Sequence, residues 1–301
     1  MKYDDYLFLY PSVSKMMPKN HPFPGKIRIY RRKVTIYTVN HLRQRLLYLY
    51  RRKQSKDKKK ECWHMKLDHI IHFTRTSPIA SSTFWNDAGF HAVTGGSHKN
   101  WGTQNALMYG PDYYIEWLTV EDGNVAEASG HPLVRQLRHD GRGFGTVCLR
   151  SDNLDQLAKQ IEGRGFPTIG PMDSERLTDA GETIRWRLLF IDQPISSALP
   201  LPFFIEWEEP DEVRFAGLKQ KGAITEFNEK LRLDALVFSV EDPARSEAEW
   251  KSLLGGSISL ENCRLAFERG TGKERLREVR FESAGQEIIF EQGSYQVPSF
   301  G

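Results

Sequence analysis

The sequence has few cysteines and no long hydrophobic run. Cys62, Cys148 and Cys263 stand alone, with no CxxC pair, which argues against a disulfide framework and against a thiolate zinc site. No apolar stretch approaches the roughly 20 residues that span a bilayer. We therefore expect a protein of a reducing compartment, the cytoplasm, with no membrane anchor and no secretory signal.

The signature loops of several protein classes are also missing. No GxGxxG or GxxxxGK motif follows a strand-like segment, which argues against a nucleotide site. No GxSxG motif surrounds Ser82 or Ser97, so serine hydrolysis has no support. The acidic runs lack the spacing of an EF-hand, so we interpret them as surface charge rather than calcium ligands.

Charge is unevenly distributed along the chain. Residues 1–64 hold 17 Lys and Arg against four acidic residues, a net of +13, and residues 65–301 hold 25 against 35, a net of −10. A basic arm with interleaved aromatic residues is suited to RNA. The acidic remainder would repel phosphates, so nucleic acid is not the expected partner.

The basic segment 1–64 has little periodicity and is predicted to lie outside the working part of the protein. Met65 opens a strand-like segment, and the codons of Lys60 and Glu61 can spell a bacterial ribosome-binding sequence. We therefore expect a mis-assigned start, with translation from Met65. The alternatives are a disordered basic arm and an organelle-targeting segment.

Two short segments are near copies of one another. Residues 113–117, Tyr-Tyr-Ile-Glu-Trp, match residues 203–207, Phe-Phe-Ile-Glu-Trp. Each follows an apolar strand and a helix, predicted at 67–73 with 79–88 and at 145–150 with 154–163. The repeat predicts an α+β fold with two βαβββ modules, at 65–122 and 143–209.

A weaker third copy follows a charged segment. Residues 210–230 are predicted to be a linker or connecting helix, and 231–301 a third βαβββ-like module. Its helix is expected at 244–254, and its later strands are expected at 257–261, 263–269, 277–282 and 287–291.

These features resemble a known superfamily. His69 on a first strand, the two matching Glu strands and residues 95–107, Gly-Gly-Ser-His-Lys-Asn-Trp-Gly-Thr-Gln-Asn-Ala-Leu, resemble the vicinal oxygen chelate superfamily, which includes glyoxalase I and extradiol dioxygenases. The closest likeness is to its glyoxalase-like domain subgroup, over 65–209 and loosely over the third module. The resemblance implies paired modules whose curved mixed sheets enclose a cleft for a small-molecule ligand.

The resemblance also implies a set of metal ligands. His69, Glu116 and Glu206 stand at three of the four ligand positions, and Thr146 departs from the expected ligand at the fourth. One imidazole and two carboxylates suit a single divalent ion of Fe, Mn, Ni or Zn. The metal would polarise a substrate carbonyl or enol, and Glu116 or Glu206 would act as general base in lyase, isomerase or dioxygenase chemistry.

Strand periodicity supports an inward orientation. Alternation places His69 on one face with Leu67 and Ile71. A carboxylate inside a strand as apolar as that of Glu116 is costly unless it is paired, protonated or bound to a metal.

A metal-free interpretation stands beside this one. Glu116 and Glu206 would pair with Arg185 or Arg187, and His69 would be a hydrogen-bonded core histidine. The protein would then bind and sequester a small aromatic or anionic compound. The Thr at position 146 and the many aromatic residues of the strands favour this alternative.

Further candidates surround the expected cleft. His98, Thr103 and Asn105 flank a Gly-rich turn and are predicted to contact substrate, as are Arg185 and Arg187; stabilisation of the turn is the alternative for the first three. In the third module Ala235 and Phe290 replace the expected His and Glu. That module is therefore expected to contribute structure or the contacts of a homodimer rather than a metal site.

Overall fold

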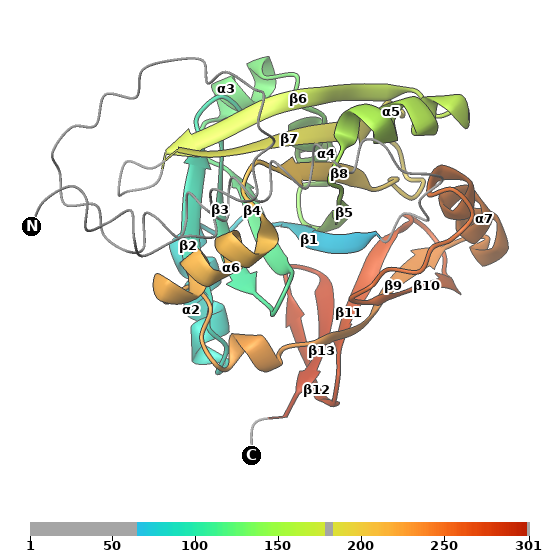
Figure 1. Ribbon diagram of the computed structural model, residues 1–301. Helices are drawn as coiled ribbons and strands as arrows, with labels where there is room; N and C mark the ends of the chain where they lie inside the picture. The colour runs from blue at the N-terminus through green and yellow to red at the C-terminus, as the bar shows by residue number, and fades with distance from the viewer. Residues whose placement is uncertain (1–64, 178–182, 300–301) are drawn as a thin grey trace, which may run out of the picture. The chain divides into compact units, whose positions relative to one another are not determined.

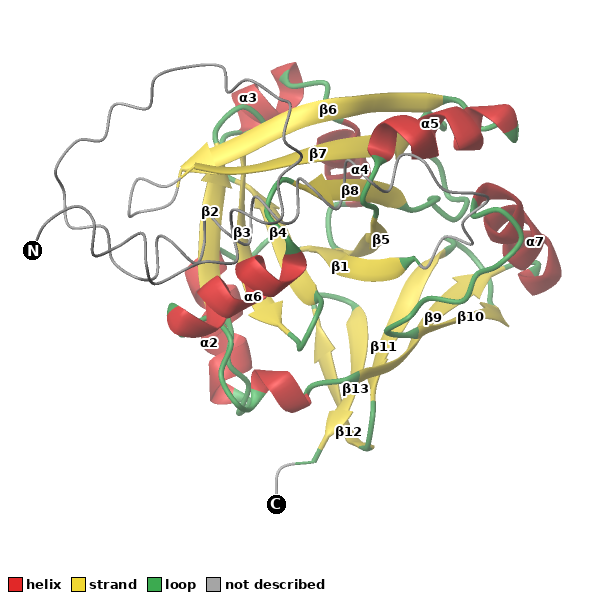
Figure 2. Ribbon diagram, viewed as in Figure 1, coloured by secondary structure: helices red, strands yellow, loops and turns green. Residues whose placement is uncertain are grey.

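The computed structural model describes residues 65–177 and 183–299, so the interpretations of residues 1–64 lie outside the described residues. Two modules with the same element order open the described part (Figures 1 and 2). The first comprises β1 (Lys66–Phe73), α2 (Pro78–Asp87), β2 (Val93–His98), β3 (Thr103–Tyr109) and β4 (Tyr114–Val120). The second comprises β5 (Gly143–Arg150), α5 (Leu154–Gly163), β6 (Thr168–Leu177), β7 (Thr183–Ile191) and β8 (Phe203–Trp207).

The two modules share one eight-stranded sheet in the order β2-β3-β4-β1-β5-β8-β7-β6. In each module the first strand pairs in parallel with the last, β1 with β4 and β5 with β8, and β1 and β5 run antiparallel in the middle. Figure 1 shows β6 and β7 crossing the top while β2 runs down the left, so the sheet curls strongly. The predicted pair of βαβββ modules is confirmed.

The sheet has two buried faces. The inner face carries a cluster that includes Ile71, Leu118, Cys148 and Phe203. Helix α4 (Pro132–Asp140), which joins the modules after α3 (Gly123–Ala128), adds buried leucines to this cluster. The outer face carries Ile70, Ile115, Val147 and Leu149 in a separate, larger core.

A β-bulge interrupts the alternation of β1. Leu67 pairs with Leu149 and His69 with Cys148, so Asp68 and His69 together oppose one residue of β5. A bulge of this kind bends the strand and redirects its side chains. Leu67 consequently lies in the outer core, whereas the alternation predicted it on the face of His69 and Ile71.

Helix ends follow local sequence chemistry. Asn153 accepts a hydrogen bond from the backbone N–H of Gln156 and caps α5, and Asp242 caps α7 (Pro243–Leu253) ahead of a proline. Helix α5 buries the apolar stripe that was predicted for it, Leu154, Leu157, Ala158 and Ile161. In the described residues, no helix is both long and apolar enough to cross a membrane.

The C-terminal part forms a second, five-stranded sheet. It comprises β9 (Leu233–Val240), α7, β10 (Arg264–Arg269), β11 (Arg275–Phe281), β12 (Ala284–Phe290) and β13 (Gly293–Pro298), in the sheet order β10-β9-β11-β13-β12. The opening strand and helix lie where they were predicted, but β9 lies between β10 and β11, whereas the first strand of each earlier module lies beside the last. Residues 257–261 make only one bridge, between Met65 and Leu260, rather than the predicted strand.

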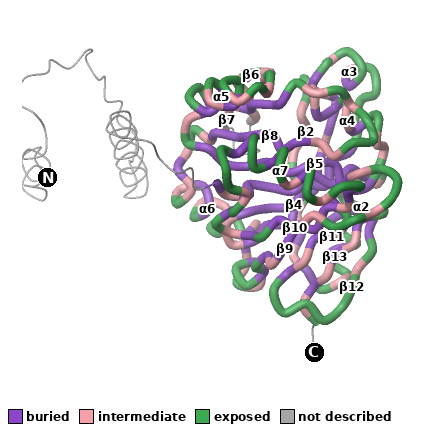
Figure 3. Tube along the Cα trace, turned by 90° about the vertical axis from the view of Figure 1, so that its right-hand side faces the viewer, coloured by how far each residue is buried: buried purple, intermediate pink, exposed green. Residues whose placement is uncertain are grey.

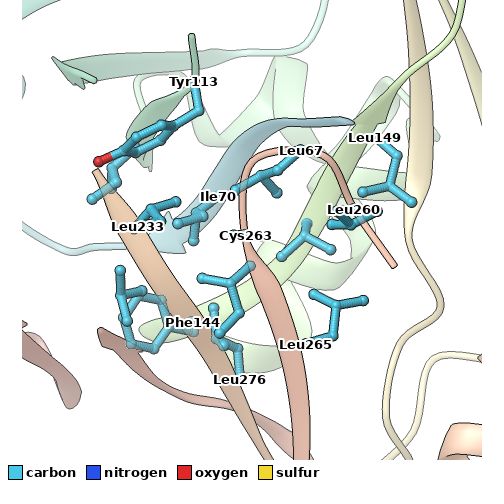
Figure 4. Close-up of a cluster of buried hydrophobic side chains, with 14 of the residues drawn as sticks. Leu67, Ile70, Tyr113, Phe144, Leu149, Leu233, Leu260, Cys263, Leu265 and Leu276 are labelled. Atoms are coloured by element: carbon cyan, nitrogen blue, oxygen red, sulfur yellow. The ribbon is translucent and has the colours of Figure 1, made fainter. Parts of the chain in front are cut away.

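This second sheet packs on the outer face of the first. Figure 4 shows Leu67, Ile70 and Leu149 of the first sheet against Leu233 and Leu276 of the second. The buried segments in Figure 3 run through the central strands of both sheets. Because the two sheets share one core, burial of the outer face of β1 and β5 depends on the C-terminal sheet.

The connection between the sheets is helical. Helix α6 (Asp211–Gln220) and the short 3-10 helix η2 (Asn228–Lys230) occupy most of the segment predicted as a linker or connecting helix. Arg214 and Phe215 of α6 are buried, so this helix packs on the body of the protein.

Candidate functional site

A buried acid–histidine–acid arrangement lies at the centre of the inner face. Asp68 Oδ1 and His69 Nδ1 are 2.8 Å apart, and His69 Nε2 is 3.7 Å from Glu116 Oε2. The exposed fractions of Asp68, His69 and Glu116 are 0%, 4% and 6%. The imidazole therefore lies between two carboxylates in a place from which most water is excluded.

Strand pairing and the bulge together build this group. Parallel pairing of β1 with β4 sets His69 opposite Tyr114 and Ile71 opposite Glu116. The bulge brings Asp68 beside His69, where alternation alone would place it on the other face. The ring of His69 stacks on Tyr114 at 4.5 Å and meets the edge of Phe203 at 5.5 Å, which fixes its orientation.

Glu116 is held by a neighbouring strand. Asn105 Nδ2 donates a hydrogen bond of 2.6 Å to Glu116 Oε1. Asn105 Oδ1 accepts one of 2.9 Å from the backbone N–H of Gly96. Asn105 thus connects the turn at Gly96 to Glu116, and its predicted contact with a substrate stays a prediction.

Two arginines surround Asp68 on its other side. Arg150 Nε donates to Asp68 Oδ2 at 2.7 Å and Arg214 Nη2 lies 3.4 Å from the same oxygen, while both arginines also reach Asp211. Burial alone would raise the pKa of Asp68, but Arg150, Arg214 and the hydrogen bond from His69 outweigh it and hold this pKa well below its ordinary value. Asp68 is therefore ionised, and His69 Nδ1 carries the proton between them.

A cleft leads toward this group. Its volume is about 1150 Å³, and its lining comes from the β2–β3 turn and from β6, β7 and β8, including His98, Trp101, Trp186 and Trp207. Trp207 lines the cleft and also contacts the buried group, because its Nε1 donates a hydrogen bond of 3.0 Å to Asp68 Oδ2. The imidazole of His98 is held by Thr103, with 3.0 Å between Nδ1 and Oγ1.

His98 lies close enough to the buried group to interact with it electrostatically. Burial lowers the pKa of His98, the Glu116 carboxylate opposes that effect, and Arg176 adds to it. The net direction is downward, so His98 is neutral at physiological pH. The structure thus brings Asn105 into contact with Glu116 and Thr103 into contact with His98, which is the member of this set that lines the cleft.

The structure places Glu206 elsewhere. Phe203 and Ile205 of β8 lie on the inner face and Phe204 in the outer core, so Glu206 faces outward with Phe204. Its Oε2 accepts a hydrogen bond of 2.9 Å from the backbone N–H of Leu154, at the start of α5.

Arg185 and Arg187, like Glu206, line the cleft but make their contacts away from His69. Arg187 Nη1 is 3.5 Å from Glu206 Oε2, as the metal-free interpretation expected, and its guanidinium also binds Asp155. Arg185 pairs with Glu175 at 3.1 Å. Thr146 donates to the carbonyl of Leu201 at 3.2 Å.

Replacing Glu206 by Gln tests this placement. We expect the free energy of unfolding in urea to fall by about 1–2 kcal/mol, because an anionic acceptor at a helix N-terminus and a partner of Arg187 are lost together. The exposed Glu208, replaced by Gln in the same way, should change it by less than about 0.5 kcal/mol. Loss of a stoichiometric metal from Glu206→Gln, measured by elemental analysis, would contradict the placement.

The predicted metal ligands do not converge. His69 and Glu116 approach each other, but Glu206 faces the other side of the sheet, and residues 65–177 and 183–299 contain no group of three His, Cys, Asp or Glu side chains placed to hold an ion. The positions that face His69 from the second module are occupied by Cys148 and Phe203. The side chains present therefore do not fit the predicted three-ligand set.

Several residues of the site were not found by sequence reasoning. Asp68, Arg150, Trp207 and Arg214 all surround one carboxylate, yet they come from β1, β5, β8 and α6. Only Asp68 carried a local signal, as an acid next to a histidine in an otherwise apolar strand. The arginines carried none, because nothing in the spacing of residues shows which distant cation a buried acid will meet.

Comparison with solved structures found similar proteins. A hypothetical protein from Staphylococcus aureus is 23% identical, with a TM-score of 0.66 over 77% of this chain and 98% of that chain. Methylmalonyl-CoA epimerase from Mycobacterium tuberculosis is 17% identical over 53% of this chain and 99% of its own, with a TM-score of 0.37. Among curated proteins, none matches this chain.

The family assignment comes from a sequence model. The model of the glyoxalase-like domain matches residues 67–254, which is more than half of the chain and extends through α6 into the C-terminal part. The predicted resemblance is thereby confirmed, and with it a small-molecule enzyme-type family. The chain belongs to the glyoxalase-like domain family of the vicinal oxygen chelate superfamily.

Proposed function

We propose that this protein is a small-molecule enzyme in which His69 transfers a proton to or from an oxygenated substrate, as in isomerase or lyase chemistry. The observation that carries the proposal is the buried imidazole between Asp68, at 2.8 Å, and Glu116, at 3.7 Å. Catalytic histidines are commonly oriented by a carboxylate on one ring nitrogen while the other nitrogen meets the substrate.

The chemistry follows from the protonation states. Asp68 is ionised and accepts the Nδ1 proton of His69, so Nε2 is the ring nitrogen that can exchange a proton with a substrate. Nε2 can take a proton from a carbon next to a carbonyl, and the electron pair of the C–H bond then moves to the carbonyl oxygen to give an enolate. Glu116 and Asp68 stabilise the resulting imidazolium from both sides, and return of the proton to a different position completes an isomerisation.

The surroundings suit such a reaction. The aromatic rings of Tyr114 and Phe203 exclude water and lower the local polarity around His69. His98 stands between the cleft and this group and is neutral, so its ring can offer a hydrogen bond to a substrate oxygen without adding charge. Side-chain motion of Trp207 or His98 is needed to admit a substrate as far as Nε2.

Proton exchange tests this function without knowledge of the product. In D₂O, a panel of small 2-oxo and 2-hydroxy acids should lose carbon-bound hydrogen signals in proton NMR when incubated with the full chain. His69→Asn should slow this exchange about 10²–10⁴-fold, the usual contribution of a general base. The half-buried His91, whose Nε2 lies 2.9 Å from the carbonyl oxygen of Gly222, is replaced by Asn as the matched control and should leave the exchange rate unchanged.

Two outcomes would count against the proposal. One is an equal exchange rate in wild type and His69→Asn, with both shown to be folded by circular dichroism. The other is no exchange by wild type with any member of the panel.

A metal-dependent form of the function has narrower support. His69 Nε2 and Glu116 Oε2 are oriented toward one another and would be the two protein ligands of a divalent ion that polarises a substrate oxygen. Two ligands are fewer than stable sites usually have. Dioxygenase chemistry, which requires such an ion, is for that reason the less favoured class.

A binding protein is the second candidate function. Its support is the apolar filling of the inner face, where Leu118, Cys148, Phe190 and Phe203 occupy positions close to His69. Tight binding of a planar acid by wild type without any proton exchange would favour this alternative.

A homodimer through the C-terminal sheet and a cytoplasmic location stay predictions.

A further inference from the structure

One arginine faces the cleft from the second module. Arg176 of β6 pairs with Ile184 of β7, and two residues earlier Ser174 pairs with Trp186. Ile184 and Trp186 both belong to the inner-face cluster, so Arg176 shares that face with them. The neighbouring Arg185 pairs instead with Glu175, on the alternate positions of the same two strands.

The Arg176 guanidinium reaches across the cleft to β2. A Cβ atom built on Gly96 would lie only 2.8 Å from Arg176 Nη1, so the absence of a side chain at position 96 leaves room for the guanidinium. Gly96 is the residue whose N–H is bonded by Asn105, the partner of Glu116. The Arg176 guanidinium therefore lies next to Gly96, which Asn105 connects to Glu116.

Arg176 differs from its neighbours Arg185 and Arg187 in its ion pairing. Within residues 65–177 and 183–299, no carboxylate lies within ion-pair distance of it, whereas Arg187 binds Asp155 and Glu206. Its charge is felt at His98, whose pKa it helps to lower. The carboxylates that line the cleft, Asp173, Glu175, Glu206 and Glu208, lie within ion-pair distance of Arg185 or Arg187 instead. The Arg176 guanidinium can therefore attract an anion, and its planar fork matches a carboxylate in two parallel hydrogen bonds.

The walls of the cleft define the rest of the ligand. Trp101, Trp186 and Trp207 line it together with Arg176 and His98. Flat aromatic surfaces with one or two fixed polar groups are typical of sites for planar organic molecules. We propose that Arg176 binds the carboxylate of a small planar organic acid, which is the substrate class of the His69 site; this inference rests on the proposed function.

Titration calorimetry with benzoate tests the proposal. Benzoate is a planar carboxylate, and benzamide is its neutral counterpart of the same shape. Wild-type full chain should bind benzoate more tightly than benzamide, and Arg176→Gln should weaken benzoate binding about 10–100-fold while leaving benzamide unaffected. Arg277→Gln, a surface charge change on the C-terminal sheet paired with Glu268, is the matched control and should change neither.

A second variant keeps the charge but moves it. Gly96→Ala adds a methyl group at the guanidinium, which is the end of a flexible side chain, so the chain should fold normally with Arg176 displaced. Benzoate binding should weaken in this variant as well. Inorganic phosphate serves as a third probe, and wild type should bind it more weakly than benzoate, because phosphate gains nothing from the aromatic walls.

The result that overturns the proposal is distinct from failure of the proposed function. Equal benzoate affinity in wild type and Arg176→Gln, no preference for benzoate over benzamide, tighter binding of phosphate, or no binding of benzoate by wild type would each refute the role of Arg176. Exchange that depends on His69, together with benzoate binding that ignores Arg176, would leave the proposed function standing and remove only this inference.

Discussion

Replacing Asp68 by Asn is expected to lower the free energy of unfolding by about 3 kcal/mol. Asp68 is fully buried and accepts hydrogen bonds from Arg150 and Trp207, with Arg214 3.4 Å away. The neutral amide leaves two guanidinium groups in a low-polarity interior with Asp211 as their remaining acidic partner. The cost of removing one partner is therefore larger than the net value of the ion pair itself.

Chemical denaturation of Asp68→Asn and wild type measures the change. The matched control is Asp234→Asn, because Asp234 pairs with Arg264 at 3.2 Å but its side chain is 42% exposed. This control should lose less than about 0.5 kcal/mol. A loss below about 1 kcal/mol in Asp68→Asn would contradict the view that this carboxylate holds the site together.

Acid should act on Asp68 in a defined range. Because its pKa in the folded protein lies well below the ordinary value of 3.8, the ionised carboxylate stabilises the fold at every pH above that value. This contribution to stability is lost only as the pH falls below 3.8 toward the lower pKa of the folded protein. Acid sensitivity at higher pH must come from other groups.

Wild type is expected to lose stability as the pH falls from 7 to 4, and replacing His72 by Gln should remove a large part of that loss. His72 is fully buried on the outer face, with Nδ1 2.5 Å from Tyr295 Oη and Nε2 3.2 Å from the carbonyl of Glu291. Burial lowers the pKa of His72 to about 3 from 6.5, although the Glu291 carbonyl opposes the shift. The neutral ring donates from Nε2 to Glu291 and accepts the Tyr295 hydroxyl proton at Nδ1.

The sign of the pH effect follows from this shift. The unfolded chain takes up a proton on His72 near pH 6.5 and the folded protein only near pH 3, so stability is complete above 6.5 and declines as the pH falls toward 3. At pH 4 the loss attributable to His72 is on the order of 3 kcal/mol.

Unfolding of wild type and His72→Gln at several pH values measures this slope. The variant should be less stable at pH 7 and less sensitive to acid, although His131, whose pKa burial also lowers to about 3, will still contribute. Parallel stability curves for wild type and His72→Gln would contradict the assignment.

Most of the fold could be predicted from the sequence because the two modules repeat. The Glu-containing strands, the helix at 154–163 and the order of elements all have local signals, and the structure confirms the paired modules. Strand β13 was missed because Gly293, Ser294 and Gln296 weaken its apolar pattern. It is stabilised instead by pairing with β11 and β12.

The site was harder to predict because two strands with similar sequences can present the same residue on opposite faces of the sheet. Glu116 and Glu206 occupy the same place in two similar pentapeptides, yet one faces inward and the other caps α5. The face of a strand residue is determined by register, and a shift of one residue reverses it. Register depends on the partner strands. One of them, β1, carries a bulge that could not be predicted from its sequence.

Helix α6 has a consequence for where this protein can be divided. A fragment that ended at residue 209 would contain both modules of the family fold, yet it would lack Asp211 and Arg214. Arg214 lies over the ring of Trp207 at 4.4 Å and reaches Asp68 beneath it. Such a truncation would expose the indole and leave the Asp68 carboxylate with a single arginine. The smallest autonomous unit therefore extends at least through α6, and an evolutionary loss of every residue after 209 would require new support for the buried Asp68–His69 pair.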